Sequence, residues 1–192
     1  MDALHYEYYD TDEYDDVCRE FHQDPRIDER NSALEVMQFP GEFRPNQREL
    51  SHSVYRQIVQ EGTLLLEAPT GIGKSLGVLF PALKAMPRSH LDKLFVLTMR
   101  TTGREAILND LKYLISSQST PTPLRVLELS ARNTLCQRPE GSCSKSICDR
   151  VKANGGDSDS AFTAALDETW MDQACVIRIA KRYRVCPYAL SQ

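Results

Sequence analysis

Two hydrophobic periods alternate along the central part of the chain. Three stretches repeat apolar residues every three to four positions, which is the spacing of one helix face, and they predict helices over residues 46–60, 75–86 and 102–117. Three short, mostly apolar runs predict strands buried on both faces, over residues 63–68, 94–98 and 125–129. Strands that alternate with helices form βαβ units, so this part of the chain predicts an α/β fold with a parallel, helix-covered sheet.

The two ends of the chain have other patterns. Residues 1–38 are acidic and rich in tyrosine and keep no sustained period, so they predict a loosely ordered lead-in. After residue 130 the alternation stops. Residues 154–160 (NGGDSDS) predict a turn or loop, and residues 167–184 predict a helix with one apolar and one basic face. We therefore divide the chain into a lead-in (1–38), a mixed α/β domain (39–130) and a third region (131–192).

Composition narrows the class of protein. The 192 residues are 41% hydrophobic and 26% charged, an ordinary globular composition that argues against wholesale disorder. No run approaches the length of a membrane span, and the acidic N-terminus lacks the features of a secretory signal, so we expect a cytoplasmic protein. The formal net charge is −4. Residues 1–30 hold 11 acidic and 3 basic side chains, and the rest of the chain is basic, which is compatible with a surface that binds a polyanion.

The sequence Ala68-Pro-Thr-Gly-Ile-Gly-Lys-Ser75 lies between a predicted strand and a predicted helix. This is the context in which a phosphate-binding loop occurs. The two glycines allow backbone N–H groups to approach phosphates, the lysine can reach the β- and γ-phosphates, and the serine hydroxyl can bind Mg²⁺. The loop therefore predicts a site for ATP and Mg²⁺. Its candidate residues are Thr70, Gly71, Ile72, Gly73, Lys74 and Ser75.

Six cysteines, five of them in the last third of the chain, suggest a metal site. In a reducing compartment such crowding is more often metal-binding or redox-active than disulfide-forming. The cysteines lie at positions 18, 136, 143, 148, 175 and 186. Four thiolates can hold either zinc or an iron–sulfur cluster, and the spacings alone leave both metals open.

Several segments together resemble one family. FRPNQ at 43–47, EAPTGIGKS at 67–75, LTMRTTGRE at 97–105 and an NTLC…CPY bracket around further cysteines are similar, in order and spacing, to the iron–sulfur branch of superfamily 2 DNA helicases, which includes XPD-like and DinG-like enzymes. The resemblance covers residues 39–192. It implies a RecA-like P-loop NTPase domain with a parallel sheet and a small, mainly helical iron–sulfur insertion.

The resemblance also implies roles for individual residues. Gln47 resembles the glutamine that reads adenine, a role that suits its paired donor and acceptor although surface glutamines are common. The segment similar to the family's backbone-tracking motif contains Arg100, Thr101 and Arg104, which would contact single-stranded DNA. Ordinary helix capping by the threonines at 101 and 102 is compatible with that role.

In the same way the resemblance implies a [4Fe–4S] cluster as the metal centre. Its implied ligands are Cys136, Cys143, Cys148 and Cys186. Cys175 is interpreted as a packing residue, and an exchange of Cys148 and Cys175 in the ligand set stays open. The basic face before Cys186, with Arg178, Lys181 and Arg182, would contact DNA beside the cluster or would simply be a solvated helix face.

The resemblance reaches only into the first motor domain. No DEAH-type acidic box follows the phosphate loop at a suitable place, and Asp167-Glu168 inside the cysteine bracket is interpreted as a chance imitation. We expect an N-terminal portion of an ATP-dependent helicase that acts on single-stranded or forked DNA and needs a second motor domain or partner subunit for activity. The alternative is a non-enzymatic module that binds nucleic acid or a partner.

Overall fold

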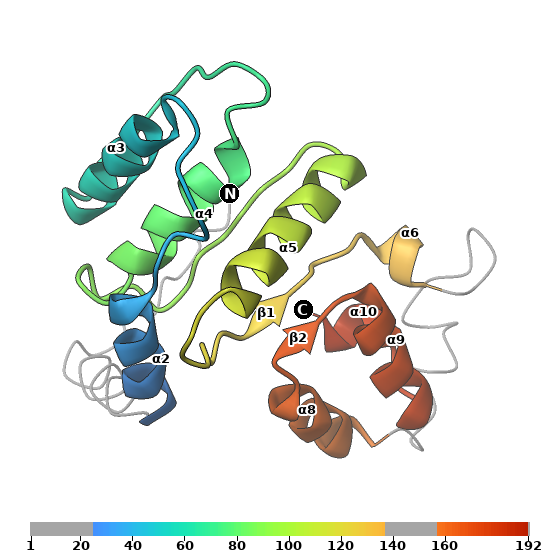
Figure 1. The fold of residues 1–192 in the computed structure, drawn as a ribbon. Helices are drawn as coiled ribbons and strands as arrows, with labels where there is room; N and C mark the ends of the chain where they lie inside the picture. The colour runs from blue at the N-terminus through green and yellow to red at the C-terminus, as the bar shows by residue number, and fades with distance from the viewer. Residues whose placement is uncertain (1–24, 137–156, 192) are drawn as a thin grey trace, which may run out of the picture. The chain divides into compact units, whose positions relative to one another are not determined.

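The computed structural model describes residues 25–136 and 157–191 of the chain, and divides it into two compact units between Pro123 and Leu124. The described part of unit 1 contains four helices, α2 (Pro25–Val36), α3 (Gln47–Val59), α4 (Lys74–Ala85) and α5 (Thr101–Ser116). Helix α4 packs against the other three, and its contact with α3 is the most extensive (Figure 1). The predicted helices over 46–60, 75–86 and 102–117 are thus confirmed to within a residue or two.

The Leu50 side chain of α3 packs closely against the backbone of α4. A Cβ atom on Gly77 would lie 2.8 Å from the Cδ2 atom of Leu50, so only glycine lets the buried leucine pack this near to α4. The hydroxyl of the next residue, Ser51, donates a buried hydrogen bond of 3.0 Å to the Gly77 carbonyl. These contacts hold the N-terminal halves of the two helices together, which is where the predicted phosphate loop enters α4.

The predicted strands over residues 63–68 and 94–98 are wrong. Both segments are extended, but neither forms part of a sheet, and within the described chain the backbones of residues 63–67 and 93–98 make no backbone hydrogen bond. The described part of the unit therefore has no parallel sheet, and the RecA-like α/β domain expected from the sequence is contradicted. A short apolar run fits a buried strand only if neighbouring strands pair with it, and no described segment pairs with these two.

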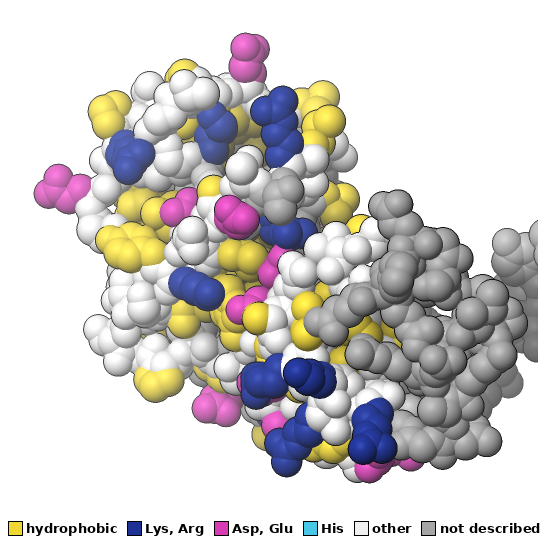
Figure 2. Space-filling model, turned by 90° about the vertical axis from the view of Figure 1, so that its right-hand side faces the viewer, with side chains coloured by type: hydrophobic (Ala, Val, Ile, Leu, Met, Phe, Trp, Pro, Cys, Tyr) yellow, Lys and Arg dark blue, Asp and Glu magenta, His cyan; other side chains and the backbone are white. Residues whose placement is uncertain are grey.

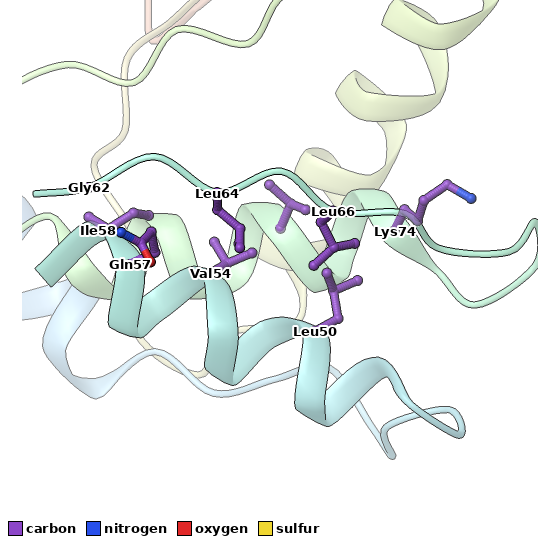
Figure 3. Close-up of a pocket in the computed structure, with 9 residues that line it drawn as sticks. Leu50, Val54, Gln57, Ile58, Gly62, Leu64, Leu66 and Lys74 are labelled. Atoms are coloured by element: carbon purple, nitrogen blue, oxygen red, sulfur yellow. The ribbon is translucent and has the colours of Figure 1, made fainter. Parts of the chain in front are cut away.

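Each of the two extended segments has a bare face, whose side chains are mostly exposed, and a second face whose apolar side chains are 39–46% exposed. Leu64 and Leu66 point toward Leu50 and Val54 of α3, around a cavity of about 440 Å³ (Figure 3). The side chain between them, Leu65, is 94% exposed. The same alternation runs through 94–99, where the most exposed side chains are those of Phe95, Leu97 and Met99. Each segment thus has the period of two that is typical of a strand, without the sheet.

Unit 2 is also mainly helical. Its described elements are β1 (Val126–Leu127), α6 (Arg132–Leu135), α8 (Ser158–Asp167), β2 (Trp170–Met171), α9 (Gln173–Arg182) and α10 (Pro187–Leu190). The two short strands pair in parallel, with Val126 opposite Trp170. The core lies between α8, α9 and the segments around them and contains Leu135, Ala161, Ala165, Met171, Cys175, Val176, Ile179, Ala180 and Val185. The predicted strand over 125–129 is therefore shorter than expected.

The helix predicted over residues 167–184 is interrupted. Its first residues belong to β2 and its flanks, because the backbone N–H groups of Val126 and Glu128 donate to the carbonyls of Thr169 and Met171. Helix α9 begins after Asp172, whose carboxylate accepts a hydrogen bond of 2.9 Å from the Cys175 N–H as an N-cap. Residues 169–171 therefore pair with β1 instead of continuing a helix.

Two further expectations are corrected. The lead-in was expected to be loosely ordered, but its residues 25–36 form α2, which buries Ala33 and Leu34. Residues 1–24 lie outside the described residues. In the loop expected over 154–160, the described residues begin a helix, because the Asp157 carboxylate accepts from the Ser160 N–H and caps α8. No helix in the described ranges is long and apolar enough to cross a membrane.

A pair of identical substitutions contrasts the buried core of unit 1 with the bare face of residues 63–67. Leu50→Ala should lower the free energy of unfolding by about 3 kcal/mol, because it removes a buried side chain between α3 and α4. Leu65→Ala should change it by less than about 0.5 kcal/mol, because that side chain is already in solvent. Urea unfolding followed by circular dichroism measures both values, and an equally large cost for Leu65→Ala would show that residues 63–67 form a buried strand.

Candidate nucleotide-binding site

An aromatic cluster fixes the segment that precedes α3. The rings of Phe39 and Phe43 stack with centroids 3.8 Å apart, and both meet Phe80 of α4 edge-on. The guanidinium of Arg48 lies 5.1 Å from the centre of the Phe43 ring, within the range of a cation–π contact. Residues 39–43 are therefore anchored on α4, which places Arg44 and Gln47 beside the loop that opens this helix.

The predicted phosphate loop leads directly into α4. Gly71 and Gly73 both have left-handed backbone angles, with φ of 89° and 81°, and Gly73 is the N-cap residue of the helix. A side chain at either position would be strained, so the two glycines have a conformational role. Lys74 is the first residue of α4 and Ser75 the second. The segment therefore leads into a helix as expected, although the described residues before it form no strand, and its role in binding phosphate stays a prediction.

The backbone donors of the loop are available. None of the N–H groups of residues 70–76 donates a hydrogen bond to another residue in the part of the chain that the structure describes. The first engaged donor is the N–H of Gly77, which bonds the Gly73 carbonyl at 2.9 Å. Donors at the start of a helix carry its positive partial charge, and such a group of N–H donors favours an anion.

Lys74 folds back onto its own loop. Its Nζ atom donates to the carbonyls of Ala68 and Pro69, at 3.0 and 2.8 Å, and the side chain is exposed. These two bonds close the loop over residues 68–74. A phosphate group could replace the two carbonyls as the acceptor, because it accepts charge-assisted hydrogen bonds more strongly.

Gln47 contacts the loop with its amide group. Its Nε2 atom donates to the Gly73 carbonyl at 2.9 Å, and its Oε1 atom accepts from the Arg44 N–H at 3.0 Å. The Arg44 guanidinium in turn donates to the Gly71 carbonyl at 2.8 Å. Sequence analysis identified Gln47 as a candidate site residue but missed Arg44. Both residues belong to the FRPNQ segment, so that segment could have indicated Arg44 as well.

The residues predicted to track DNA in unit 1 lie at the start of α5. Arg100 is exposed and is the N-cap residue, Thr101 is the first residue of the helix, and Arg104 lies in its first turn. The hydroxyl of Thr98 donates to the Arg100 carbonyl at 3.4 Å. In Figure 1 both α4 and α5 begin at the upper side of unit 1. Two helix N-termini with nearby basic residues form a chemically suitable surface for phosphates.

The basic residues predicted in unit 2 lie on α9. Lys181 and Arg182 are exposed in its last turn, and Lys and Arg side chains gather in the lower part of Figure 2. Arg178 is already paired, because its Nη2 atom lies 2.8 Å from the Glu168 carboxylate and 3.2 Å from the Cys175 sulfur. Glu168, part of the acidic pair interpreted as an imitation of a helicase box, is thus used in an exposed ion pair.

Of the four predicted cluster ligands, the structure describes two. Cys136 ends α6 and Cys186 precedes α10, both thiols are partly exposed, and the two helices pack against each other. Cys143 and Cys148 lie outside the described residues. Within residues 25–136 and 157–191, no three His, Cys, Asp or Glu side chains converge in a way that could hold a metal ion.

Cys175 differs from these two cysteines in its surroundings. It is buried in the core of unit 2, and desolvation, reinforced by the Glu168 carboxylate, raises the pKa of its thiol despite the nearby Arg178. A thiol whose pKa is raised is less readily the thiolate that a metal requires. Its position fits the interpretation as a packing residue, and the ligand set itself stays a prediction.

Comparisons with protein-family models, with curated proteins and with solved structures found no significant match to this chain.

Proposed function

We propose that residues 68–75 bind the phosphates of ATP together with Mg²⁺, as the nucleotide site of an ATP-dependent DNA helicase of the iron–sulfur type. The observation that carries this proposal is the loop itself. It presents a series of unengaged N–H donors at the start of α4, two left-handed glycines and a lysine as the first helical residue. Few functions other than phosphate binding need all of these features in one loop.

The chemistry of binding follows from the side chains of the loop. The Lys74 ammonium would leave the carbonyls of Ala68 and Pro69 and donate to the β- and γ-phosphates. The Ser75 hydroxyl, one residue further along α4, would bind the magnesium ion that bridges the same phosphates. The N-terminal charge of α4 adds a stabilising interaction with the bound anion.

Two observations support DNA as the second ligand. In unit 1, exposed Arg100 and the first turn of α5 form a suitable site for backbone phosphates. In unit 2, the last turn of α9 presents Lys181 and Arg182 to solvent, just before Cys186. A [4Fe–4S] cluster on Cys136, Cys143, Cys148 and Cys186 would pin this region as a structural centre and so fix where the basic face lies.

Turnover needs more than binding. Hydrolysis requires an acidic group that positions magnesium and a cation that stabilises the charge around the γ-phosphate. In the helicase family that the sequence resembles, this acidic group and this cation belong to motifs other than the segments that carry the resemblance. We therefore expect these 192 residues alone to bind nucleotide without efficient hydrolysis.

A second candidate function is a non-enzymatic module that binds nucleic acid. The basic end of α9 favours it, because that surface does not depend on the phosphate loop. In this case DNA binding would be insensitive to nucleotide.

The two candidates are separated by measuring ATP and single-stranded DNA binding on the same preparation, together with ATP turnover. A nucleotide site coupled to DNA predicts that saturating ATP changes the affinity for single-stranded DNA and, reciprocally, that DNA changes the affinity for ATP by the same factor. A module predicts DNA binding with no such change. A protein that binds no ATP at any DNA concentration would contradict the proposed helicase site.

A further inference from the structure

Two carbonyl groups of the phosphate loop are held by side chains from the segment before α3 and from α3 itself. The Gly71 carbonyl accepts a hydrogen bond of 2.8 Å from Arg44, and the Gly73 carbonyl accepts one of 2.9 Å from Gln47. Arg44 and Gln47 are also bonded to each other, because the Gln47 oxygen accepts from the Arg44 N–H. The four residues therefore form one connected network on one side of the loop.

Holding a carbonyl also fixes the N–H group of the next residue. A trans peptide unit is planar, and its C=O and N–H bonds point in opposite directions. The bond from Arg44 therefore directs the Ile72 N–H away from Arg44. The Gly73 carbonyl is shared by Gln47 and the Gly77 N–H, and together these two bonds direct the Lys74 N–H away from Gln47. Neither of these N–H groups donates to another residue within the described ranges, so both are directed away from the network and left for a ligand.

Gln47 has little capacity left for a base. Its side chain is 2% exposed, and both its oxygen and its nitrogen already have partners within the protein. It also packs tightly on the loop, since a Cβ atom on Gly73 would collide with the Gln47 Nε2 atom. Reading an adenine would require this buried amide to give up its bonds, at a cost that unsatisfied buried polar groups make high.

We propose that Arg44 and Gln47 are positioning residues that preorganise the phosphate loop, and that their effect on binding is independent of the nucleobase. The proposal rests on the function proposed above. A loop whose peptide groups are already oriented loses less conformational freedom on binding, so the gain appears in the affinity for phosphates. Any ligand with the same polyphosphate therefore depends on the two residues to the same extent.

The test compares three magnesium-bound ligands that share a triphosphate, namely ATP, GTP and inorganic tripolyphosphate. Arg44→Ala and Gln47→Ala should each weaken all three by about tenfold, the effect of one lost hydrogen bond of about 1.4 kcal/mol. Matched controls are Arg56→Ala, which removes the same charge from the exposed last turn of α3, and Gln60→Ala at the C-cap of the same helix. Both controls should stay within about twofold of the wild-type protein.

Two further variants distinguish positioning from a purely structural role. Gln47→Met keeps the volume of the buried side chain and removes its hydrogen bonds. It should therefore leave no cavity and keep the circular dichroism spectrum of the wild type, while losing affinity for all three ligands. Arg44→Lys keeps a donor and a charge and should recover a large part of the affinity lost in Arg44→Ala. If Gln47→Met binds all three ligands normally, the glutamine only fills space and the inference is wrong.

The failure of this inference and the failure of the proposed function give different results. If Gln47→Ala weakens ATP and leaves GTP and tripolyphosphate unchanged, Gln47 reads the base and the inference is overturned, while the nucleotide site stands. If all three ligands bind the wild-type protein, and Lys74→Ala abolishes binding while the Arg44 and Gln47 variants bind normally, only the inference fails. If none of the ligands binds the wild-type protein, the proposed function fails and the inference fails with it.

Discussion

Lys74→Ala is expected to weaken Mg·ATP binding by about 100-fold. The ammonium group would make charge-assisted hydrogen bonds to the phosphates, worth about 3 kcal/mol together, and each 1.4 kcal/mol corresponds to a factor of ten in affinity. The loss should exceed that of any single substitution in the Arg44 and Gln47 network, because those residues act on the loop and Lys74 acts on the ligand. Isothermal titration calorimetry with ATP and magnesium measures the change.

One control and one further variant in the loop make the Lys74 result specific. Lys93→Ala removes the same charge from an exposed position in unit 1 and should leave the affinity within about twofold of that of the wild-type protein. Ser75→Ala should weaken binding only when magnesium is present, because its hydroxyl is expected to contact the ion. An unchanged affinity in Lys74→Ala would mean that the loop is a tight turn without a phosphate ligand.

Cys136→Ser is expected to abolish an iron–sulfur cluster. Protein purified without oxygen should be brown and contain about four irons and four acid-labile sulfides per chain, and the variant should lose both, because four thiolates hold a cluster of this type. Metal and sulfide analysis with a visible absorption spectrum measures the loss. A colourless wild-type protein with one zinc ion per chain would contradict the cluster and favour a zinc site.

The matched control for the cluster is Cys175→Ala. This thiol is buried among apolar side chains of unit 2, so alanine removes the sulfur without placing an unsatisfied hydroxyl in the core. The variant should keep its iron and sulfide. If it loses them and Cys148→Ala does not, the two cysteines exchange places in the ligand set.

The helices of unit 1 could be predicted from the sequence, but the sheet that the sequence also predicted is not formed by the described residues. The apolar residues of 46–60 and 102–117 recur at helical spacing, and a helix satisfies its own backbone hydrogen bonds, so local periodicity is sufficient for these elements. The runs at 63–68 and 94–98 have the composition of buried strands. A strand, however, needs a partner strand from elsewhere in the chain. The composition of an apolar run does not tell whether such a partner exists.

The candidate site could be predicted in part, for similar reasons. The phosphate loop is a contiguous motif, so its glycines and Lys74 are visible in the sequence. The network on its other side depends on how residues 39–43 are anchored against Phe80, which joins segments far apart in the sequence. Arg178 was predicted to contact DNA because its spacing places it on the basic face of a helix. In the structure its guanidinium is instead paired with Glu168, a contact that helical spacing does not reveal.

The bare faces of residues 63–67 and 94–99 have a practical consequence. They combine exposed leucine and phenylalanine side chains with backbone groups that pair with no other described segment. Segments of this kind can template intermolecular β-pairing, and they carry none of the prolines that natural edge strands use against it. We therefore expect concentration, before temperature, to limit the handling of these 192 residues in isolation, because crowded chains would aggregate through the two segments.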